Sequence, residues 1–210
     1  MANIPAKKSL GQNFLKDENI LRKIADSFDV TEKDLIIEIG PGMGALTKYL
    51  IQKSSDLLCY EIDERLKDTL LSFSKENVQI IFDDFLKRNL KEDLQKDYEK
   101  IYVIANIPYY ITTPIIEHIL ASGLIIHGMT LLVQKEVAMR FSAKPGSKDY
   151  GYFTVFLQHY FFVQKLFDVH PHAFSPPPKV MSSVVRLVRK EKLIELDESK
   201  FFEFLKMAFH

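Results

Sequence analysis

One segment, residues 37–44, constrains the fold more than any other part of the chain. A mostly apolar run enters a turn in which three glycines alternate with other residues. The run over residues 35–39 is typical of a buried strand, and residues 45–52 are compatible with a helix. Glycines let the backbone approach a ligand without a Cβ in the way, and the helix N-terminus offers unpaired N–H groups. The segment therefore predicts the strand–turn–helix unit with which α/β folds bind a nucleotide-like ligand.

The spacing of the glycines narrows the choice of ligand. Gly40, Gly42 and Gly44 form G-x-G-x-G, whereas dinucleotide enzymes use G-x-G-x-x-G. Glu61 ends the next apolar run, at the place where an acid that holds ribose hydroxyls is expected. The turn and the acid together indicate an adenosine-containing cofactor.

Short apolar runs alternate with amphipathic segments along the first two thirds of the chain. We predict strands at 35–39, 57–61, 78–82, 101–105 and 129–134, and helices at 17–28, 45–52, 64–73, 86–96 and 114–120. This order predicts a mostly parallel sheet with helices on both faces. Right-handed crossovers would then place the carboxyl ends of the first four strands along one edge.

The rest of the chain is less regular. Residues 1–13 are expected to be irregular and residues 142–152 to form a mobile loop, while residues 153–161 fit either a helix or a strand. The runs 163–169 and 184–188 predict an antiparallel hairpin, and residues 198–209 a final helix. The predicted class is therefore an α/β fold with an antiparallel addition.

Four residues that could contact a ligand stand at the ends of the first four predicted strands. They are Gly40, Glu61, Asp84 and Asn106. An acid that follows a strand usually caps a helix, and Asp83 taken alone favours that role. Because four strand ends meet at one edge, we interpret Asp84 as a ligand-binding residue.

The sequence Asn106-Ile107-Pro108-Tyr109 suits one kind of chemistry. The exocyclic amine of a base is a poor nucleophile because its lone pair is delocalised into the ring. Two acceptors aimed at its hydrogens, the Asn106 side-chain oxygen and the Ile107 carbonyl before Pro108, would favour the nucleophilic amine. Tyr109 can stack on the base. The pattern indicates methyl transfer to an amino group, and the alternative is a plain turn.

A proline-rich segment stands near the end of the chain. Residues 174–179 read Phe-Ser-Pro-Pro-Pro-Lys, which predicts a stiff, extended connection. We interpret it as a wall of the active site that holds Phe174 in place. The alternatives are a rigid loop or a ligand for a small adaptor domain. His170 and His172 suggest zinc, but no third or fourth ligand is nearby, so no metal is predicted.

Composition gives limits and no specific partner. The 210 residues contain 28 Lys and Arg and 28 Asp and Glu, so net charge indicates no anionic partner, although basic residues cluster near both ends and in the middle. These clusters are either RNA contacts or ordinary solvated faces. Cys59 is the single cysteine, which excludes an internal disulfide, and the sequence contains neither an apolar run of membrane-spanning length nor a signal peptide. We expect a cytoplasmic location.

Four motifs together resemble one family. Residues 7–15, 38–44, 106–109 and 174–180 are similar to the small-subunit ribosomal RNA adenine dimethyltransferases, the kasugamycin-sensitivity enzymes. The resemblance spans nearly the whole chain. It implies a Rossmann-like (class I) methyltransferase fold with a seven-stranded sheet. It also implies that S-adenosylmethionine is used to dimethylate N6 of two adjacent adenosines in the 3′-terminal hairpin of small-subunit rRNA, on the immature small ribosomal subunit.

The resemblance also implies roles for individual residues. Asn13 and Leu15 would contact the cofactor from the N-terminal segment, and Gly40 with Gly42 would lie under its methionine part. Glu61 would bind the ribose, and Asp84 the adenine amino group. Asn106 would serve both cofactor and target, with the Ile107 carbonyl as second acceptor beside Pro108. Tyr109 and Phe174 would sandwich the flipped adenine.

The chain departs from the family pattern at two places. Tyr110 stands where relatives often have Asn, so one contact near the target base is open. Such enzymes also continue into a small helical domain, and we expect residues 1–190 to form the methyltransferase domain and residues 191–210 the start of a truncated helical domain. A monomer is expected.

Three other functions stay open from the sequence. The first is methylation of large-subunit rRNA that confers macrolide resistance, although residues 176–180 and 184–187 look more like the small-subunit branch. The second is a non-catalytic ribosome-assembly factor that binds RNA, against which Glu61, Asp84 and Asn106 argue. The third is a small-molecule or protein N-methyltransferase, and the clustered basic residues favour RNA over it.

Overall fold

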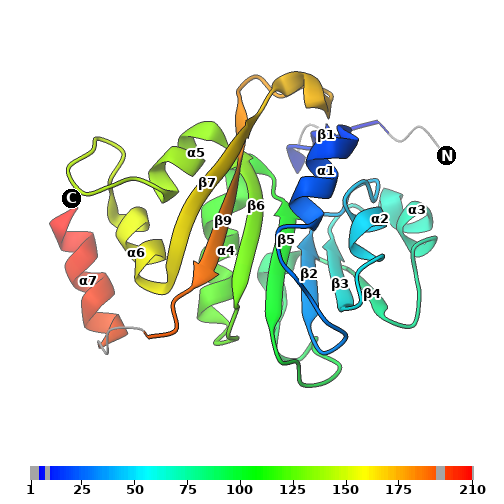
Figure 1. Ribbon diagram of the computed structural model, residues 1–210, viewed down its shortest axis with the longest axis horizontal. Helices are drawn as coiled ribbons and strands as arrows, with labels where there is room; N and C mark the ends of the chain where they lie inside the picture. The colour runs from blue at the N-terminus through cyan, green and yellow to red at the C-terminus, as the bar shows by residue number, and fades with distance from the viewer. Residues whose placement is uncertain (1–4, 8–9, 193–196, 210) are drawn as a thin grey trace.

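A seven-stranded sheet forms the centre of the molecule (Figure 1). The computed structural model describes residues 5–7, 10–192 and 197–209. The strands of this sheet are β2 (Leu35–Ile39), β3 (Asp56–Glu61), β4 (Val78–Phe82), β5 (Ile101–Asn106), β6 (Gly128–Gln134), β7 (Phe161–Val169) and β9 (Ser182–Arg189). Their spatial order is β4-β3-β2-β5-β6-β9-β7. The first five in this order are parallel, and β9 pairs antiparallel with both β6 and β7.

Helices cover both faces of the sheet because its strands are apolar on both sides. In β2, Leu35, Ile37 and Ile39 belong to one buried cluster, and Ile36 belongs to the other. The first cluster contains residues of α4 (Thr112–Ala121), α5 (Lys135–Phe141) and α6 (Tyr152–Tyr160). The second contains residues of α1 (Glu18–Ala25) and α2 (Thr47–Leu50). This two-sided core confirms the predicted mostly parallel sheet with helices on both faces.

A second sheet joins two distant parts of the chain. β1 (Phe14–Leu15) pairs antiparallel with β8 (Phe174–Ser175), and Leu15 lies opposite Phe174. The Ser175–Pro176 peptide bond is cis. The N-terminal segment is thereby held against the proline-rich segment, a contact that periodicity could not predict.

Most predicted elements are present, but the prediction of a helix over residues 86–96 is wrong. Only a single 3₁₀ turn forms there, η3 (Phe85–Lys87), and Arg88 after it is extended. Asp84 accepts a hydrogen bond from the Leu86 N–H and so caps the turn. Tertiary contacts override the helical pattern, because the Arg88 side chain binds Asp83 and Asp93.

Other helices lie close to their predicted positions. Asp17 caps α1 by accepting from the Asn19 and Ile20 N–H groups. The predicted helix 64–73 is present as η2 (Glu64–Leu66) and α3 (Lys67–Leu71), and η4 (Tyr109–Ile111) precedes α4. Of the ambiguous residues 153–161, all but Phe161 lie in α6, and Phe161 begins β7, whereas α5 was not predicted.

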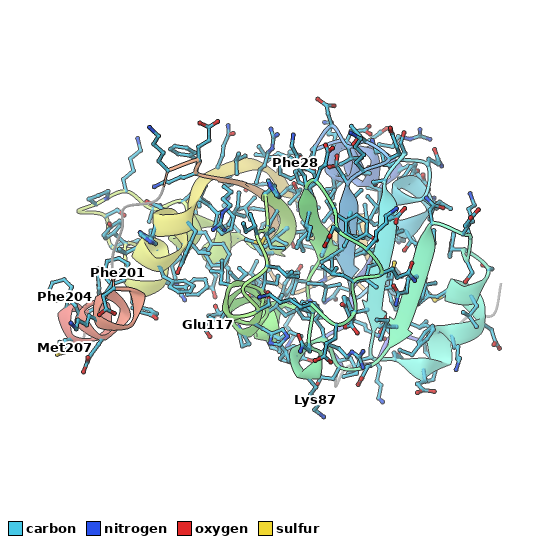
Figure 2. All side chains as sticks on the ribbon, turned by 90° about the horizontal axis from the view of Figure 1, so that it is seen from below. Phe28, Lys87, Glu117, Phe201, Phe204 and Met207 are labelled. Atoms are coloured by element: carbon cyan, nitrogen blue, oxygen red, sulfur yellow. The ribbon has the colours of Figure 1, made fainter. Side chains whose placement is uncertain are left out.

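The predicted antiparallel addition is confirmed. Strands β7 and β9 pair with each other, and η5 (Pro171–Ala173) and β8 lie in the connection between them. The final helix, α7 (Glu198–Ala208), lies at one end of the molecule (Figure 1). Figure 2 shows Phe204 and Met207 on its outer side, where they are 61% and 67% exposed.

Candidate active site

A cavity of about 280 Å³ lies at the carboxyl ends of β2, β3, β4 and β5. This is the sheet edge predicted to hold a ligand, and ten of the eleven predicted site residues line it. They are Asn13, Leu15, Gly40, Gly42, Glu61, Asp84, Asn106, Ile107, Pro108 and Tyr109. Phe174 is the exception.

The glycine turn forms the floor of this cavity. Gly40, Gly42 and Gly44 have φ angles of +68°, +60° and +78°, which L side chains rarely adopt. A Cβ on Gly42 would lie 2.9 Å from Cε1 of Phe14, so the N-terminal segment packs directly on the turn. Glycine is therefore required here both by conformation and by close approach.

Glu61 links the end of β3 to the glycine turn. Its side chain is 4% exposed, one carboxylate oxygen accepts from the Gly42 N–H at 2.9 Å, and the other accepts from the Asp63 N–H at 2.9 Å. Burial raises the pKa of this carboxyl. A carboxylate has about four acceptor positions, so these two hydrogen bonds do not exhaust its capacity.

A second buried acid, Glu38, lies beneath the turn. It is 1% exposed and lines the cavity, and its Oε2 accepts from the Cys59 thiol at 3.6 Å. Burial raises its pKa to about 8, and the nearby Glu61 carboxylate contributes in the same direction. Glu38 belongs to the motif of residues 37–44, but no role could be assigned to it from the sequence, because its depth is visible only in the fold.

Asp83 and Asp84 follow β4 and both line the cavity. The Asp84 N–H donates to Asp83 Oδ1 at 2.7 Å, and Asp84 Oδ1 accepts from the Leu86 N–H at 3.1 Å. The hydrogen bond from Asp84, with that from Arg88, holds the pKa of Asp83 below its usual value. Asp84 thus caps the η3 turn, a role that the sequence favoured for Asp83, and it also lines the cavity.

The N-terminal segment closes one side of the cavity through polar contacts. Gln12 Nε2 donates to Asp63 Oδ2 at 2.9 Å, and Asn106 Nδ2 donates to the Asn13 carbonyl at 3.3 Å. Arg65 also binds Asp63 and lowers the pKa of that carboxyl to about 2. Gln12 and Asp63 were not predicted as site residues, because their partners are far apart in sequence.

The segment after β5 presents two acceptors. The Asn106 amide nitrogen is occupied by Asn13, and no hydrogen bond to Asn106 Oδ1 or to the Ile107 carbonyl occurs among the residues that the structure describes. The Pro108 carbonyl is used by the Ile111 N–H at 3.2 Å. Tyr109 is half-buried, and its hydroxyl hydrogen-bonds to Ser182. Among the described residues, both oxygens therefore keep their acceptor capacity.

Phe174 is not among the residues that line the cavity. Its side chain is 2% exposed and packs in the cluster behind Leu15, its partner in the small sheet. The Phe174 prediction needs this correction: the residue supports the cavity wall through Leu15. The motif identified the segment, but burial decided the direction of the side chain.

The charge of the cavity excludes phosphate-bearing ligands. Glu38, Glu61, Asp83 and Asp84 line it, and among the described lining residues none is Lys, Arg or His. The Gly42 N–H, which a dinucleotide enzyme would offer to phosphate, already donates to Glu61. A ligand in which adenosine carries a cationic group, such as a sulfonium or an ammonium, suits this acidic environment. Within the described part of the chain, no group of three or more His, Cys, Asp or Glu side chains is arranged so that it could hold a metal ion.

The sheet order, the glycine turn and the acidic cavity define a Rossmann-like methyltransferase. The model of one family, ribosomal RNA adenine dimethylase, matches residues 3–210. The chain therefore belongs to the ribosomal RNA adenine dimethylase family. Ribosomal RNA small subunit methyltransferase A of Staphylococcus aureus (strain JH9) is 45% identical over 212 residues, which covers 97% of this chain and 71% of the relative.

Two solved structures resemble the fold. A dimethyladenosine transferase from Plasmodium falciparum has a TM-score of 0.80 at 28% identity, over 93% of this chain and 70% of that protein. The 23S rRNA methyltransferase ErmE has a TM-score of 0.73 at 27% identity, over 92% of this chain and 78% of that protein. No helix among the described residues is long and apolar enough to cross a membrane.

Proposed function

We propose that this protein transfers methyl groups from S-adenosylmethionine to N6 of two adjacent adenosines in the 3′-terminal hairpin of small-subunit rRNA, on the immature small ribosomal subunit. Membership of the dimethylase family and the 45% identity to a small-subunit methyltransferase support this function. The choice between small- and large-subunit RNA rests on that identity, because ErmE shares the fold.

The acceptor pair at Asn106 and Ile107 is the observation that carries the proposal. Both oxygens are without hydrogen-bond partners among the described residues and stand beside the acidic cavity. They would accept from the two hydrogens of an adenine amine and favour its tetrahedral, nucleophilic form. No side-chain general base is required, since positioning and the two acceptors act on the amine directly.

In this proposal, different residues of the cavity bind different parts of the cofactor. Glu61 would hold the ribose hydroxyls, Asp84 the adenine amino group, and Gly40 and Gly42 the methionine part, with Asn13 and Leu15 closing the N-terminal side. S-adenosylmethionine, when bound, supplies a methyl group on a sulfonium. Tyr109 would stack on the target adenine.

The test is transfer of labelled methyl from S-adenosylmethionine to unmethylated small ribosomal subunits, free hairpin RNA and large-subunit RNA. We expect N6-dimethyladenosine in the small subunit alone. Asn106→Ala should lower kcat by about 10²–10³, as loss of a preorganised group at a reacting centre does, and should weaken cofactor binding only modestly. Asn89→Ala, at an exposed position outside the cavity, is the matched control.

Three results would count against the proposal. Label in large-subunit RNA would identify the other branch of the fold. Near-wild-type turnover of Asn106→Ala would remove the acceptor mechanism. Tight cofactor binding without transfer to any RNA would favour a non-catalytic assembly factor.

The setting of the reaction is also proposed. We expect a monomer that acts in the cytoplasm, where the buried thiol of Cys59 stays reduced. Residues 1–190 would form the catalytic unit, with residues 191–210 leading into a helical region. Clustered lysines and arginines would bind RNA phosphates, so subunit binding should weaken as salt rises.

A further inference from the structure

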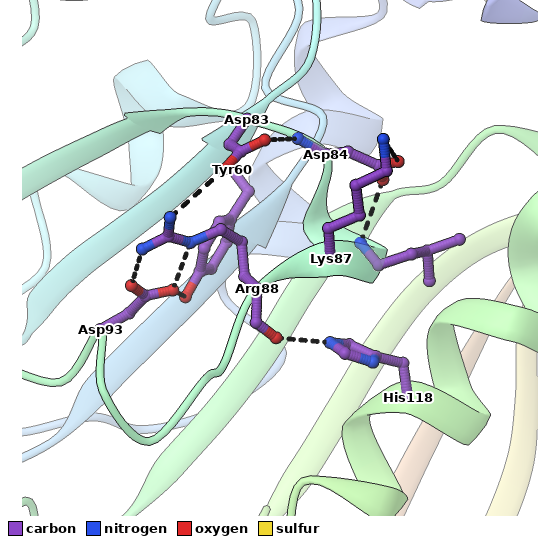
Figure 3. A network of polar contacts seen from close by, with 8 residues as sticks. Tyr60, Asp83, Asp84, Lys87, Arg88, Asp93 and His118 are labelled. Carbon is purple, nitrogen blue, oxygen red and sulfur yellow. Dashed lines mark hydrogen bonds and ion pairs between the residues drawn. The ribbon is translucent and has the colours of Figure 1, made fainter.

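A network of polar side chains lies beside the cavity and is not used by the reaction as described (Figure 3). At its centre, the Arg88 guanidinium bridges two carboxylates. Nε donates to Asp93 Oδ2 at 3.1 Å, Nη2 donates to Asp93 Oδ1, and Nη1 donates to Asp83 Oδ2 at 3.3 Å. The Tyr60 hydroxyl donates to the same Asp93 Oδ2 at 3.0 Å. One arginine therefore joins two acids that are ten positions apart.

The network ends on Asp84. Asp83, held by Arg88 through one oxygen, accepts the Asp84 N–H through the other at 2.7 Å. Asp84 Oδ1 is occupied by the Leu86 N–H, whereas Oδ2 has only the Lys87 ammonium at 3.8 Å. Asp84 is thus held at its carboxylate by the Leu86 N–H and the Lys87 ammonium, and at its backbone N–H by Asp83.

The network also connects Asp84 to Glu61. Tyr60 directly precedes Glu61 on β3, as Asp83 directly precedes Asp84 after β4. The Phe85 ring stands edge-on to Tyr60, with centroids 5.0 Å apart, and edge-on to His118 at 5.3 Å. Asp84 and Glu61, the two acids expected to bind the cofactor, are therefore connected through the same set of packed side chains.

Arg88 acts from outside the cavity, because it is not among the residues that line it. Its partner Asp93 is only 4% exposed at the side chain, while Asp83 is 44% exposed. A planar guanidinium can bind Asp93 through two nitrogens and still donate to Asp83. A lysine ammonium is a point charge that cannot reproduce this fork.

We propose that Arg88 is a positioning residue that, through Asp83, fixes the Asp84 carboxylate for recognition of the cofactor's adenine amino group. The inference rests on the proposed function, because it assumes an adenosine cofactor bound to Asp84. Arg88 contributes selectivity for adenine and no direct contact.

The experiment compares two ligands by calorimetry: S-adenosylhomocysteine and the analogue in which hypoxanthine replaces adenine. The analogue has a carbonyl oxygen where adenine has an amino group, so a fixed carboxylate accepts from the first ligand and repels the second. The proteins are the wild type, Arg88→Gln, Arg88→Lys, Asp84→Ala and the exposed control Arg140→Gln. Arg88→Lys keeps the charge next to buried Asp93 if Arg88→Gln fails to fold.

We expect the wild type and Arg140→Gln to prefer the adenine ligand by about tenfold or more, the size of a hydrogen bond to a charged group. Asp84→Ala should lose the preference, and both Arg88 variants should reduce it by at least about threefold. In turnover, the Arg88 variants should raise KM for S-adenosylmethionine and leave kcat at saturation nearly unchanged. A purely structural role would lower the active fraction and weaken both ligands equally.

The outcomes separate this inference from the function on which it rests. An unchanged preference in both Arg88 variants, with a lost preference in Asp84→Ala, overturns the inference and leaves the methyltransferase proposal intact. An unchanged preference in Asp84→Ala overturns the inference at its premise, while wild-type methyl transfer still stands. Failure of the wild type to bind either ligand or to transfer methyl overturns both.

Discussion

Replacing Glu38 by Gln should make the stability of the protein less dependent on pH. The carboxyl is 1% exposed, and burial raises its pKa from 4.5 to about 8. Below pH 4.5 the group is protonated in the folded and unfolded chain alike, and Glu38 adds no penalty. Between pH 4.5 and 8 the folded state binds the extra proton, so the free energy of unfolding falls as pH rises.

The magnitude follows from the difference between the folded and unfolded pKa values. A tenfold change in proton affinity corresponds to about 1.4 kcal/mol, so a pKa raised from 4.5 to about 8 gives a loss of about 5 kcal/mol above pH 8. Between pH 5 and 8 the wild type should lose about 4 kcal/mol that Glu38→Gln keeps. Glutamine has nearly the shape of the protonated acid and carries no charge at any of these pH values.

Urea unfolding at pH 5, 6, 7 and 8 measures the effect. Glu38→Gln and the wild type should be similar in stability at pH 5 and diverge steadily toward pH 8, with the variant more stable. Glu76→Gln, at an exposed position, should follow the wild type throughout. Parallel curves for Glu38→Gln and the wild type would refute the assignment of a neutral, buried carboxyl beneath the glycine turn. Glu61, whose pKa is also raised, is present in both proteins.

Three further predictions concern the wall, the turn and the charge of the cavity. Phe174→Ala removes a fully buried ring and should cost about 3–5 kcal/mol in urea unfolding, whereas a loss under about 1 kcal/mol would place the ring outside the core. Gly44→Ala should cost about 1–2 kcal/mol, because φ is +78° and the new Cβ would lie 2.3 Å from Cε2 of Phe73; an unchanged midpoint would contradict this. Adenosine should inhibit methyl transfer at least about tenfold more strongly than adenosine 5′-monophosphate, since the acidic lining repels phosphate, and equal inhibition would show that this repulsion is absent.

The sheet could be predicted from the sequence because buried parallel strands leave a local signal. Residues 35–39 and 78–82 are mostly apolar runs, and both form strands with the predicted bounds. The ligand edge followed from topology alone, since Glu61, Asp84 and Asn106 stand at strand ends. Local pattern and global fold agree in these places.

The failures come from contacts between distant residues. The expected helix over residues 86–96 is absent because Asp93 binds Arg88 and also accepts from the hydroxyl of Tyr60, which lies 33 positions away. The hydrophobic periodicity of a sequence carries no information about a partner so far away in the chain. Phe174 was identified by its motif, but its burial depends on β1, a two-residue strand with no pattern of its own.

The acidic cavity and the acceptor pair together constrain which ligands can enter the site and how the target base must reach it. Phosphates of a polynucleotide are disfavoured in a cavity that is lined by acidic residues and, among the described residues, by no Lys, Arg or His, because like charges repel strongly in a partly dry site. A base carries no charge and can enter, provided that its backbone stays outside. The target adenosine must therefore leave its stack to reach Asn106, and the same field that rejects phosphate favours a cationic methyl donor. Selection of donor and extrusion of the acceptor base thus share one physical cause, the acidic lining at the carboxyl edge of the sheet.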